Sequence, residues 1–197
     1  MIRIALTGSI GMGKSKVASM FERAGVPLFD ADAEVRRLQG PGGALVEAIA
    51  QRFPGSVRDG AVDREALSAL VLGKPDELAA LEAIVHPAVH QARSRFILDH
   101  ADALALLFDI PLLFETAGEA AFDKVIVVSV PPEIQRARVL SRPGMTPQKL
   151  DAILARQLPD EDKRSRADFV IETGGLIAET ERQVKHILAC LGLAAGE

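Results

Sequence analysis

The feature that most restricts the possible folds of this chain is a glycine-rich stretch directly after an apolar segment near its start. Residues 8–15 read GSIGMGKS and match the pattern G-x-x-x-x-G-K-[ST] in full. The apolar segment Ile2–Thr7 predicts a buried β-strand before this stretch, and Lys14–Arg23 predicts an amphipathic helix after it. A strand, a glycine-rich turn and a helix in this order are typical of a loop that binds phosphate groups.

Each part of this motif has a chemical reason. Its glycines would let the backbone turn successive N–H groups toward phosphate oxygens. Lys14 would reach the β- and γ-phosphates of a nucleotide, and the hydroxyl of Ser15 would bind Mg²⁺. The alternative is a glycine-rich turn that contains Lys-Ser by chance. A dinucleotide-binding fingerprint is excluded, because Lys16 stands where the last glycine of that pattern would be.

The rest of the chain predicts an α/β fold. Four more short apolar runs predict strands, at Val26–Asp30, Ala103–Asp109, Lys124–Val130 and Asp168–Glu172. They lack polar alternation, which is typical of parallel strands covered on both faces. We therefore expect a three-layer, doubly wound parallel sheet of about five strands, of the P-loop NTPase type.

Helical patterns separate the predicted strands unevenly. They lie at Pro87–His100, Pro132–Ser141, Pro147–Gln157 and Leu176–Leu191, and each of the three prolines suits the first turn of its helix. Two long helical stretches, about 33–102 and 132–166, are interpreted as lobes inserted into a single domain that spans residues 1–197. The core of that domain would then comprise about 1–32, 103–131 and 167–197.

Composition excludes several classes of protein. The chain has 23 Lys and Arg against 27 Asp and Glu, a formal net charge of −4, which argues against a nucleic-acid-binding surface. No apolar run approaches the roughly 18 residues that a membrane helix needs. Its one cysteine, Cys190, indicates a reducing compartment, and we expect it in the core near the end of the last helix. We expect a cytoplasmic monomer, with an oligomer left open.

A phosphate-binding loop of this kind occurs in both GTP-dependent switches and small-molecule kinases. The D-x-x-G and N-K-x-D motifs expected of GTPases are missing, and the nearest approach to the second, at Gly73–Asp76, lacks its asparagine. A kinase is therefore favoured. A nucleotide-binding regulator that has kept the loop and lost turnover remains an alternative from another class.

Two aspartates lie where parallel strands end, at the edge where ligands bind in open α/β sheets. Asp32, just past the second predicted strand, could accept the proton of an attacking hydroxyl and help to hold Mg²⁺. Its alternative role is an N-cap, although Asp30 is the better candidate for a structural role. Asp109 suits a magnesium-ordering role, with capping or a surface turn as the alternative, and Glu115 could support the same site.

The stretch 132–166 contains six arginines, which could form a solvated helical face. A kinase, however, needs cations that neutralise charge on the transferred phosphoryl group. Arg142 precedes Pro143-Gly144 at the tip of this lobe and is the best candidate, followed by Arg138. His86 and His90 have the i, i+4 spacing of a metal pair but no evident third ligand.

Taken together, these segments resemble the dephospho-CoA kinase family, over nearly the whole chain. The matching segments are TGSIGMGKS at 7–15, FDAD at 29–32, HP at 86–87, DIPLLFE at 109–115 and the lobe from Pro132 to Gln157. Many kinases share the phosphate loop. The combination of FDAD with DIPLLFE is far more specific.

The resemblance implies ATP-dependent phosphorylation of the ribose 3′-hydroxyl of dephospho-CoA, with ATP and Mg²⁺ bound. It implies that 33–102 binds CoA and that 132–166 forms a lid. Lys16 and Thr173 depart from the family pattern, which has Thr and Asn there. The alternative is another small P-loop kinase acting on a nucleoside, nucleotide or sugar-like alcohol. The residues expected in the site are, for catalysis, Asp32, Lys14 and Arg142; for nucleotide binding, Gly8, Ser9, Gly11, Met12, Gly13, Lys14, Ser15, Lys16 and Arg142; and for the metal, Ser15, Asp32 and Asp109.

Overall fold

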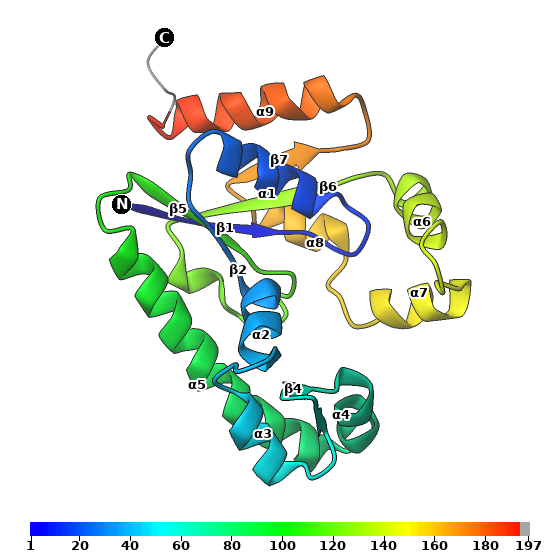
Figure 1. The fold of residues 1–197 in the computed structure, drawn as a ribbon. Helices are drawn as coiled ribbons and strands as arrows, with labels where there is room; N and C mark the ends of the chain where they lie inside the picture. Colours follow the sequence, from blue (N-terminus) through cyan, green and yellow to red (C-terminus); the bar gives the residue numbers. More distant parts are fainter. Residues whose placement is uncertain (194–197) are drawn as a thin grey trace. The chain divides into compact units, whose positions relative to one another are not determined.

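The strands predicted from the sequence form one sheet in the computed structural model, which describes residues 1–193. The strand order is β2-β5-β1-β6-β7, and β1 at the centre pairs in parallel with both of its neighbours (Figure 1). This arrangement confirms the predicted α/β fold. The strands are β1 (Ile2–Thr7), β2 (Leu28–Asp30), β5 (Ala105–Asp109), β6 (Lys124–Ser129) and β7 (Phe169–Glu172).

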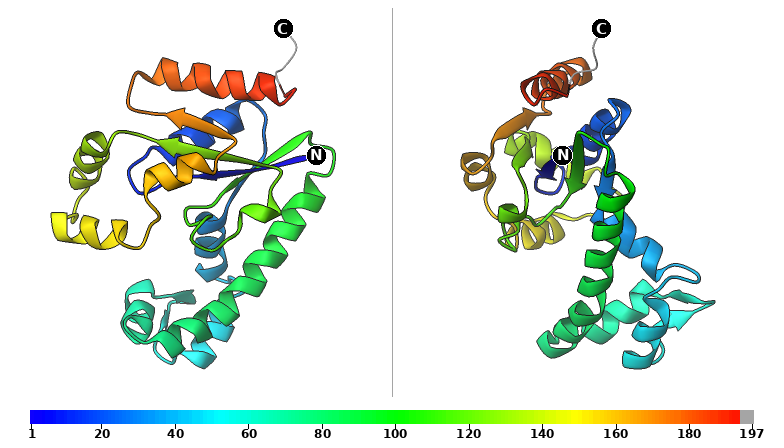
Figure 2. Two further views of the ribbon diagram at one scale, coloured as in Figure 1. Left: turned by 180° about the vertical axis from the view of Figure 1, so that it is seen from behind. Right: turned by 90° about the vertical axis from the view of Figure 1, so that its left-hand side faces the viewer.

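The sheet is covered on both faces. Ile4 and Leu6 of β1 point into a core shared with α1 (Lys14–Arg23) and α9 (Ile177–Cys190). Ala5, between them, faces a second cluster that includes Leu113 and Phe114. This alternation follows from the period of two along a strand. Figure 2 shows α9 and α1 on one side of the strands, and three layers result.

By its internal contacts the chain divides into two compact units. The first comprises Met1–Phe29 and His100–Glu197, and the second Asp30–Asp99. The second unit has its own core, centred on Ile49 and Phe53. Its elements are α2 (Ala31–Gln39), α3 (Val46–Arg52), α4 (Arg64–Val71), α5 (Pro75–Asp99) and the antiparallel pair β3 (Val57–Arg58) and β4 (Ala61–Val62). This unit covers most of the stretch 33–102, which is interpreted above as the first inserted lobe. The role of this lobe in binding CoA stays a prediction.

The first unit also contains the segment expected as a lid. It forms α6 (Pro132–Leu140), α7 (Pro147–Leu154) and α8 (Asp160–Ser165), and a single-turn helix η1 (Glu119–Ala121) precedes β6. Pro132 and Pro147 lie in the first turn of α6 and α7, as predicted. Thr146 caps α7 by accepting a hydrogen bond from the Lys149 N–H.

The expected helix start at Pro87 is wrong. Pro87 lies inside α5, which begins twelve residues earlier at Pro75. Asp76 and Glu77 in the first turn of α5 provide the negative charge that favours a helix start there. The helix then continues through Pro87, although proline at this position removes one backbone hydrogen bond.

The expected burial of Cys190 is also wrong. Its thiol is exposed at the last residue of α9 and lies 3.6 Å from Nε2 of His186, one turn earlier. The buried side of α9 is formed instead by Val184, Ile187 and Leu188. Cys190 falls off this apolar stripe, and its residue type alone misled the prediction.

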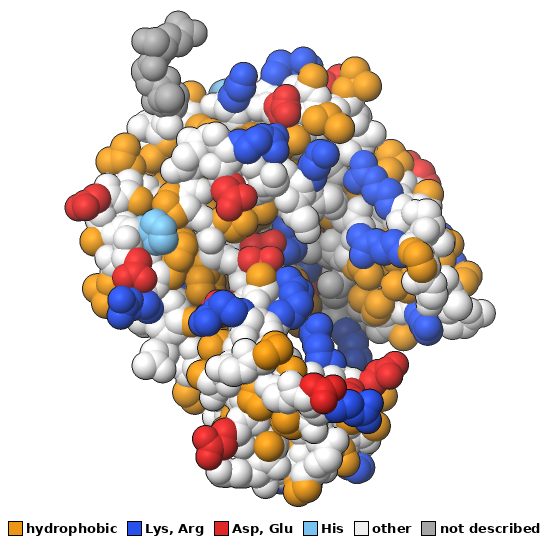
Figure 3. Space-filling view, in the orientation of Figure 1, with side chains coloured by type: hydrophobic (Ala, Val, Ile, Leu, Met, Phe, Trp, Pro, Cys, Tyr) orange, Lys and Arg blue, Asp and Glu red, His pale blue; other side chains and the backbone are white. Residues whose placement is uncertain are grey.

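The outer face of α1 and α9 carries both acidic and basic side chains. Arg23 lies 3.5 Å from Glu181 and Arg182 lies 3.9 Å from Glu179, and Figure 3 shows basic and acidic side chains interspersed there. Within residues 1–193, no helix is both long and apolar enough to cross a membrane.

Candidate active site

The turn between β1 and α1 has the form of an anion-binding loop. Gly11 and Gly13 have φ angles of 80° and 92°, which residues with a Cβ rarely adopt. A Cβ on Gly11 would also lie 2.5 Å from Cγ2 of Val139, so α6 packs directly against the loop. Among residues 1–193, the N–H groups of Gly11, Gly13, Lys14 and Ser15 donate no hydrogen bond. These amides are therefore available to an anion.

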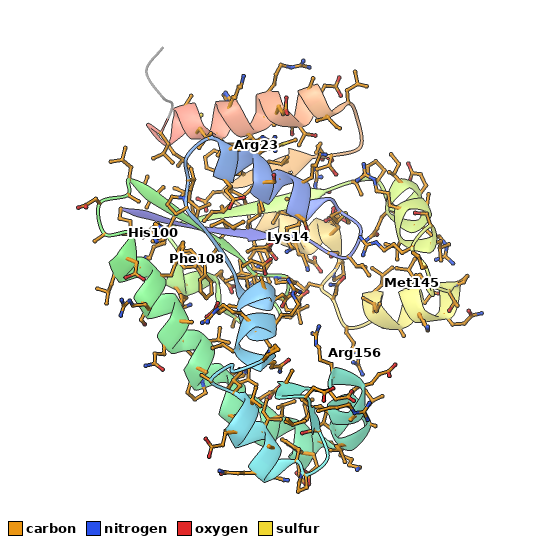
Figure 4. The ribbon with its side chains drawn as sticks, in the orientation of Figure 1. Lys14, Arg23, His100, Phe108, Met145 and Arg156 are labelled. Carbon is orange, nitrogen blue, oxygen red and sulfur yellow. The ribbon has the colours of Figure 1, made fainter. Side chains whose placement is uncertain are left out.

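A buried ion pair lies beside this loop. Lys14, at the start of α1 (Figure 4), pairs through Nζ with Oδ1 of Asp109 at the end of β5. The two side chains are only 16% and 7% exposed, so Asp109 is not part of a surface turn. Asp109 stands opposite Leu6 in the sheet, which places it at the same edge as the loop. The structure thus brings together the loop, its lysine and the predicted carboxylate.

A second contact to the loop comes from Thr173, just after β7. Its hydroxyl donates a hydrogen bond of 2.6 Å to the Met12 carbonyl. Arg138 of α6 holds Thr173 in place, because its guanidinium donates to the Thr173 hydroxyl at 3.0 Å and to its carbonyl at 2.6 Å. Thr173 also packs against Gly13, where a Cβ would lie 3.1 Å from its hydroxyl. Arg138 therefore acts on the loop through Thr173.

Most arginines of the lid are bonded to protein groups. Arg136, Arg164 and Arg166 are exposed and form ion pairs with Asp151, Glu172 and Glu119, as a solvated charged face allows. Arg138 is the exception, because it is partly buried and bonded to Thr173.

Arg156 is exposed and has no such partner in the described part of the chain, and the same holds for Arg142. Arg142 lines a cavity of about 300 Å³ beside the loop, together with Gly11, Gly13, Lys16, Arg138 and Thr173.

Two glutamines that the sequence did not single out bind the loop at one residue. Gln135 of α6, which is buried, donates from Nε2 to the Ile10 carbonyl at 2.7 Å. Gln157, after α7, accepts a hydrogen bond of 3.1 Å from the Ile10 N–H. Both polar groups of Ile10 are thus bound by the lid. Glutamine carries no spacing signal, so sequence reasoning could not have found this contact.

A buried ion pair fixes the other end of the lid to the domain core. Nζ of Lys163 in α8, which is fully buried, lies 2.8 Å from Oε1 of Glu115. The same oxygen accepts a hydrogen bond of 2.8 Å from the Leu158 N–H. Burial raises the pKa of Glu115, but its contacts with Lys163 and with the Leu158 N–H outweigh burial and lower that pKa overall. Glu115 therefore has a structural partner within the lid.

A polar network joins α8 to the ends of two strands. The hydroxyl of Ser129, the last residue of β6, donates to Asp160 at 2.5 Å and accepts from Arg164 at 2.8 Å. Arg164 also pairs with Glu172, the last residue of β7. Both ends of this six-residue helix are therefore tied to the sheet.

Asp32 belongs to the second unit. It is exposed and lies in the first turn of α2. The N-cap of α2 is Asp30, whose carboxylate accepts a hydrogen bond of 2.8 Å from the Ala33 N–H. The structural role predicted for Asp30 is confirmed, and the capping alternative for Asp32 is wrong.

The histidine pair lies in the same unit. His86 and His90 are exposed on α5. Within residues 1–193, no group of three or more His, Cys, Asp or Glu side chains is placed to hold a metal ion. The pair therefore has no third ligand of these types in the described part of the chain.

Comparisons with known proteins settle the family. The family model described as dephospho-CoA kinase matches residues 2–179. The chain belongs to the dephospho-CoA kinase family. A dephospho-CoA kinase of Novosphingobium aromaticivorans is 53% identical over 188 residues, 95% of this chain and 94% of that protein. One of Brucella melitensis is 50% identical over 194 residues, 97% and 96% of the two chains.

A solved structure has a closely similar fold. A Thermus thermophilus protein has a TM-score of 0.84 at 37% identity, covering 96% of this chain and 97% of that one. Family membership makes this chain a P-loop kinase that transfers phosphate to an alcohol.

Proposed function

We propose that this dephospho-CoA kinase family member phosphorylates the ribose 3′-hydroxyl of dephospho-CoA with ATP, giving CoA and ADP. The observation that carries the proposal is the loop geometry. The amides of Gly11, Gly13, Lys14 and Ser15 have no hydrogen-bond partner among residues 1–193, so they are available to an anion. The dipole of α1 adds positive potential there.

Lys14 supplies the cation of the phosphate site. Its ammonium group pairs with Asp109, so it is already held beside the loop with little exposure to water. Lys14 would contact the β- and γ-phosphates when ATP binds. The remaining loop residues in the proposal are Gly8, Ser9, Met12 and Lys16, with Arg142 facing the same cavity.

The residues beside the loop fit a magnesium ion. Mg²⁺ is usually held by one or two protein oxygens together with substrate phosphates. Ser15 offers a hydroxyl and Asp109 a buried carboxylate at the same sheet edge, and Asp32 is the third residue proposed for this shell. When bound, the ion would neutralise charge on the β- and γ-phosphates.

Asp32 is the proposed general base. Its exposed carboxylate would accept the proton of the 3′-hydroxyl, whose oxygen then forms a bond to the γ-phosphorus. The bond from that phosphorus to the β,γ-bridging oxygen breaks, and ADP leaves with the electron pair. Arg142, which has no partner among the described residues, would neutralise charge on the phosphoryl group in transit.

A panel of acceptors tests the proposed substrate. ADP release by the full chain with ATP and Mg²⁺ is measured with dephospho-CoA, adenosine, AMP, gluconate and shikimate. We expect release to depend on dephospho-CoA, with the new phosphate on the ribose 3′-oxygen by NMR. Release driven by another acceptor would favour the other small P-loop kinases. ATP binding without release for any acceptor would favour a regulator.

A further inference from the structure

We propose that Gln135 and Gln157 are positioning residues that set the orientation of the phosphate loop by binding both polar groups of Ile10. This inference rests on the proposed function, because it concerns how the loop binds ATP. Neither residue touches the reacting atoms in the proposal. They act through the backbone of the loop.

The role of Gln135 follows from the geometry of the peptide group. In a trans peptide, the carbonyl of one residue and the N–H of the next point in opposite directions. Gln135 holds the Ile10 carbonyl at 2.7 Å, on the side where α6 packs against the loop. The Gly11 N–H must therefore point the opposite way. It is one of the four amides without a partner in residues 1–193.

Gln157 has the complementary role. It accepts the hydrogen bond of the Ile10 N–H at 3.1 Å, which turns the carbonyl of Ser9 toward the loop interior. There, the Ser9 carbonyl accepts a hydrogen bond of 3.2 Å from the Met12 N–H. Together the two glutamines orient the peptide groups on both sides of Ile10. Without them, the Ile10 carbonyl could turn toward the phosphates and repel them.

The two contacts have opposite polarity, which makes an isosteric test possible. Gln135 donates to Ile10, whereas Gln157 accepts from it. A glutamate keeps the acceptor but loses the donor. Gln135→Glu would therefore place a carboxylate against a carbonyl, and Gln157→Glu would keep its hydrogen bond. Both variants add one negative charge next to Ile10. The difference between their Kd values for ATP therefore reports the direction of the lost or kept hydrogen bond.

The experiment measures the Kd for ATP of the full-length variants by calorimetry. Gln148→Glu is the charge control, because Gln148 is exposed on α7 and its side chain makes no hydrogen bond to the loop among the described residues. Relative to this control, we expect Gln135→Glu to raise the Kd roughly 10- to 100-fold, as for an unpaired buried polar group. Gln157→Glu should stay within about threefold of the control, and Gln157→Leu, which lacks an acceptor, should bind more weakly than Gln157→Glu.

Titration with adenosine separates positioning from general damage to the fold. Adenosine lacks phosphates, so its Kd should not change in any variant that remains folded by circular dichroism. If Gln135→Glu does not fold, Gln135→Met can replace it, because it removes the donor without adding charge. It should raise the Kd for ATP and leave the Kd for adenosine unchanged.

Equal Kd values for Gln135→Glu and Gln157→Glu, or equal weakening of ATP and adenosine binding, would overturn the inference. If the unaltered protein binds no ATP, the proposed function fails instead.

Discussion

Breaking the buried ion pair between Lys163 and Glu115 should destabilise the fold strongly, and Lys163→Met tests this. The variant replaces a fully buried ammonium group with an apolar side chain of similar length. The Glu115 carboxylate, 12% exposed, then loses its cation and keeps the hydrogen bond from the Leu158 N–H. Its second oxygen, Oε2, has no hydrogen-bond partner in residues 1–193 even with Lys163 present. The substitution therefore leaves a buried charge uncompensated.

The expected loss follows from this geometry. Breaking a buried pair by removing one partner costs about 3–5 kcal/mol. We take the lower end, about 3 kcal/mol, because one hydrogen bond to Glu115 survives. For a chain of this length, 1 kcal/mol shifts the Tm by roughly 2–4 °C, so the Tm should fall by about 6–12 °C. Lys185→Met, at an exposed position on α9, should change stability by no more than about 0.5 kcal/mol.

The effect should also depend on pH. The pKa of Glu115 is lowered in the folded chain, so the ion pair with Lys163 stabilises the fold at every pH above the ordinary glutamate pKa. This stabilisation is lost as the pH falls through the pKa that Glu115 has in the folded chain. Without Lys163, one of the contacts that oppose the effect of burial on this pKa is lost, so Glu115 should bind a proton more readily in the folded variant, which relieves the buried charge. The difference between the two proteins should therefore shrink between neutral pH and about pH 4.5.

Circular dichroism during heating is the appropriate assay, because the chain has no Trp or Tyr to report unfolding by fluorescence. The double variant with Glu115→Gln should be more stable than the two single losses predict by addition. A Tm shift no larger than that of Lys185→Met, or strict additivity in the double variant, would show that the pair does not hold the lid.

Three predictions concern catalysis. Lys14→Ala should nearly abolish ADP release while the far-ultraviolet spectrum persists, and full activity would refute the phosphate-loop assignment. Asp32→Asn should lower kcat roughly 10²- to 10⁴-fold, the usual contribution of a positioned base, whereas a two- to threefold fall would exclude that role. Arg142→Ala should lower kcat by roughly 10³-fold or more if it acts as arginine fingers do, and an unchanged kcat would make Arg142 a solvated side chain.

Local sequence patterns predicted the elements that carry the phosphate loop. The bounds of β1 and α1 agree with the prediction, because a buried apolar run, a glycine-rich turn and an amphipathic stripe are each encoded within a few residues. The position of Asp109 followed in the same way from the end of an apolar run. Each of these features depends on neighbours in the chain.

Long-range polar contacts could not be predicted. Gln135 and Gln157 bind a residue more than a hundred positions away, and neither is marked by spacing or by residue type. A lysine in a charged segment such as the one around Lys163 is usually exposed to solvent. Lys163 is nevertheless fully buried, because Glu115 compensates its charge. Pairing of this kind depends on tertiary packing, which one sequence does not reveal.

The ends of the lid are held more firmly than the turn between α6 and α7. Both α6 and α8 are tied to the domain core through buried polar groups, by Gln135 and Lys163 respectively. The turn between α6 and α7 carries Arg142, which is exposed, and Gly144, whose φ is 73°. Local opening begins where few buried contacts oppose it. If Arg142 acts on a bound phosphate as proposed, this turn is where we expect the segment to open, while α6 and α8 stay bound to the core.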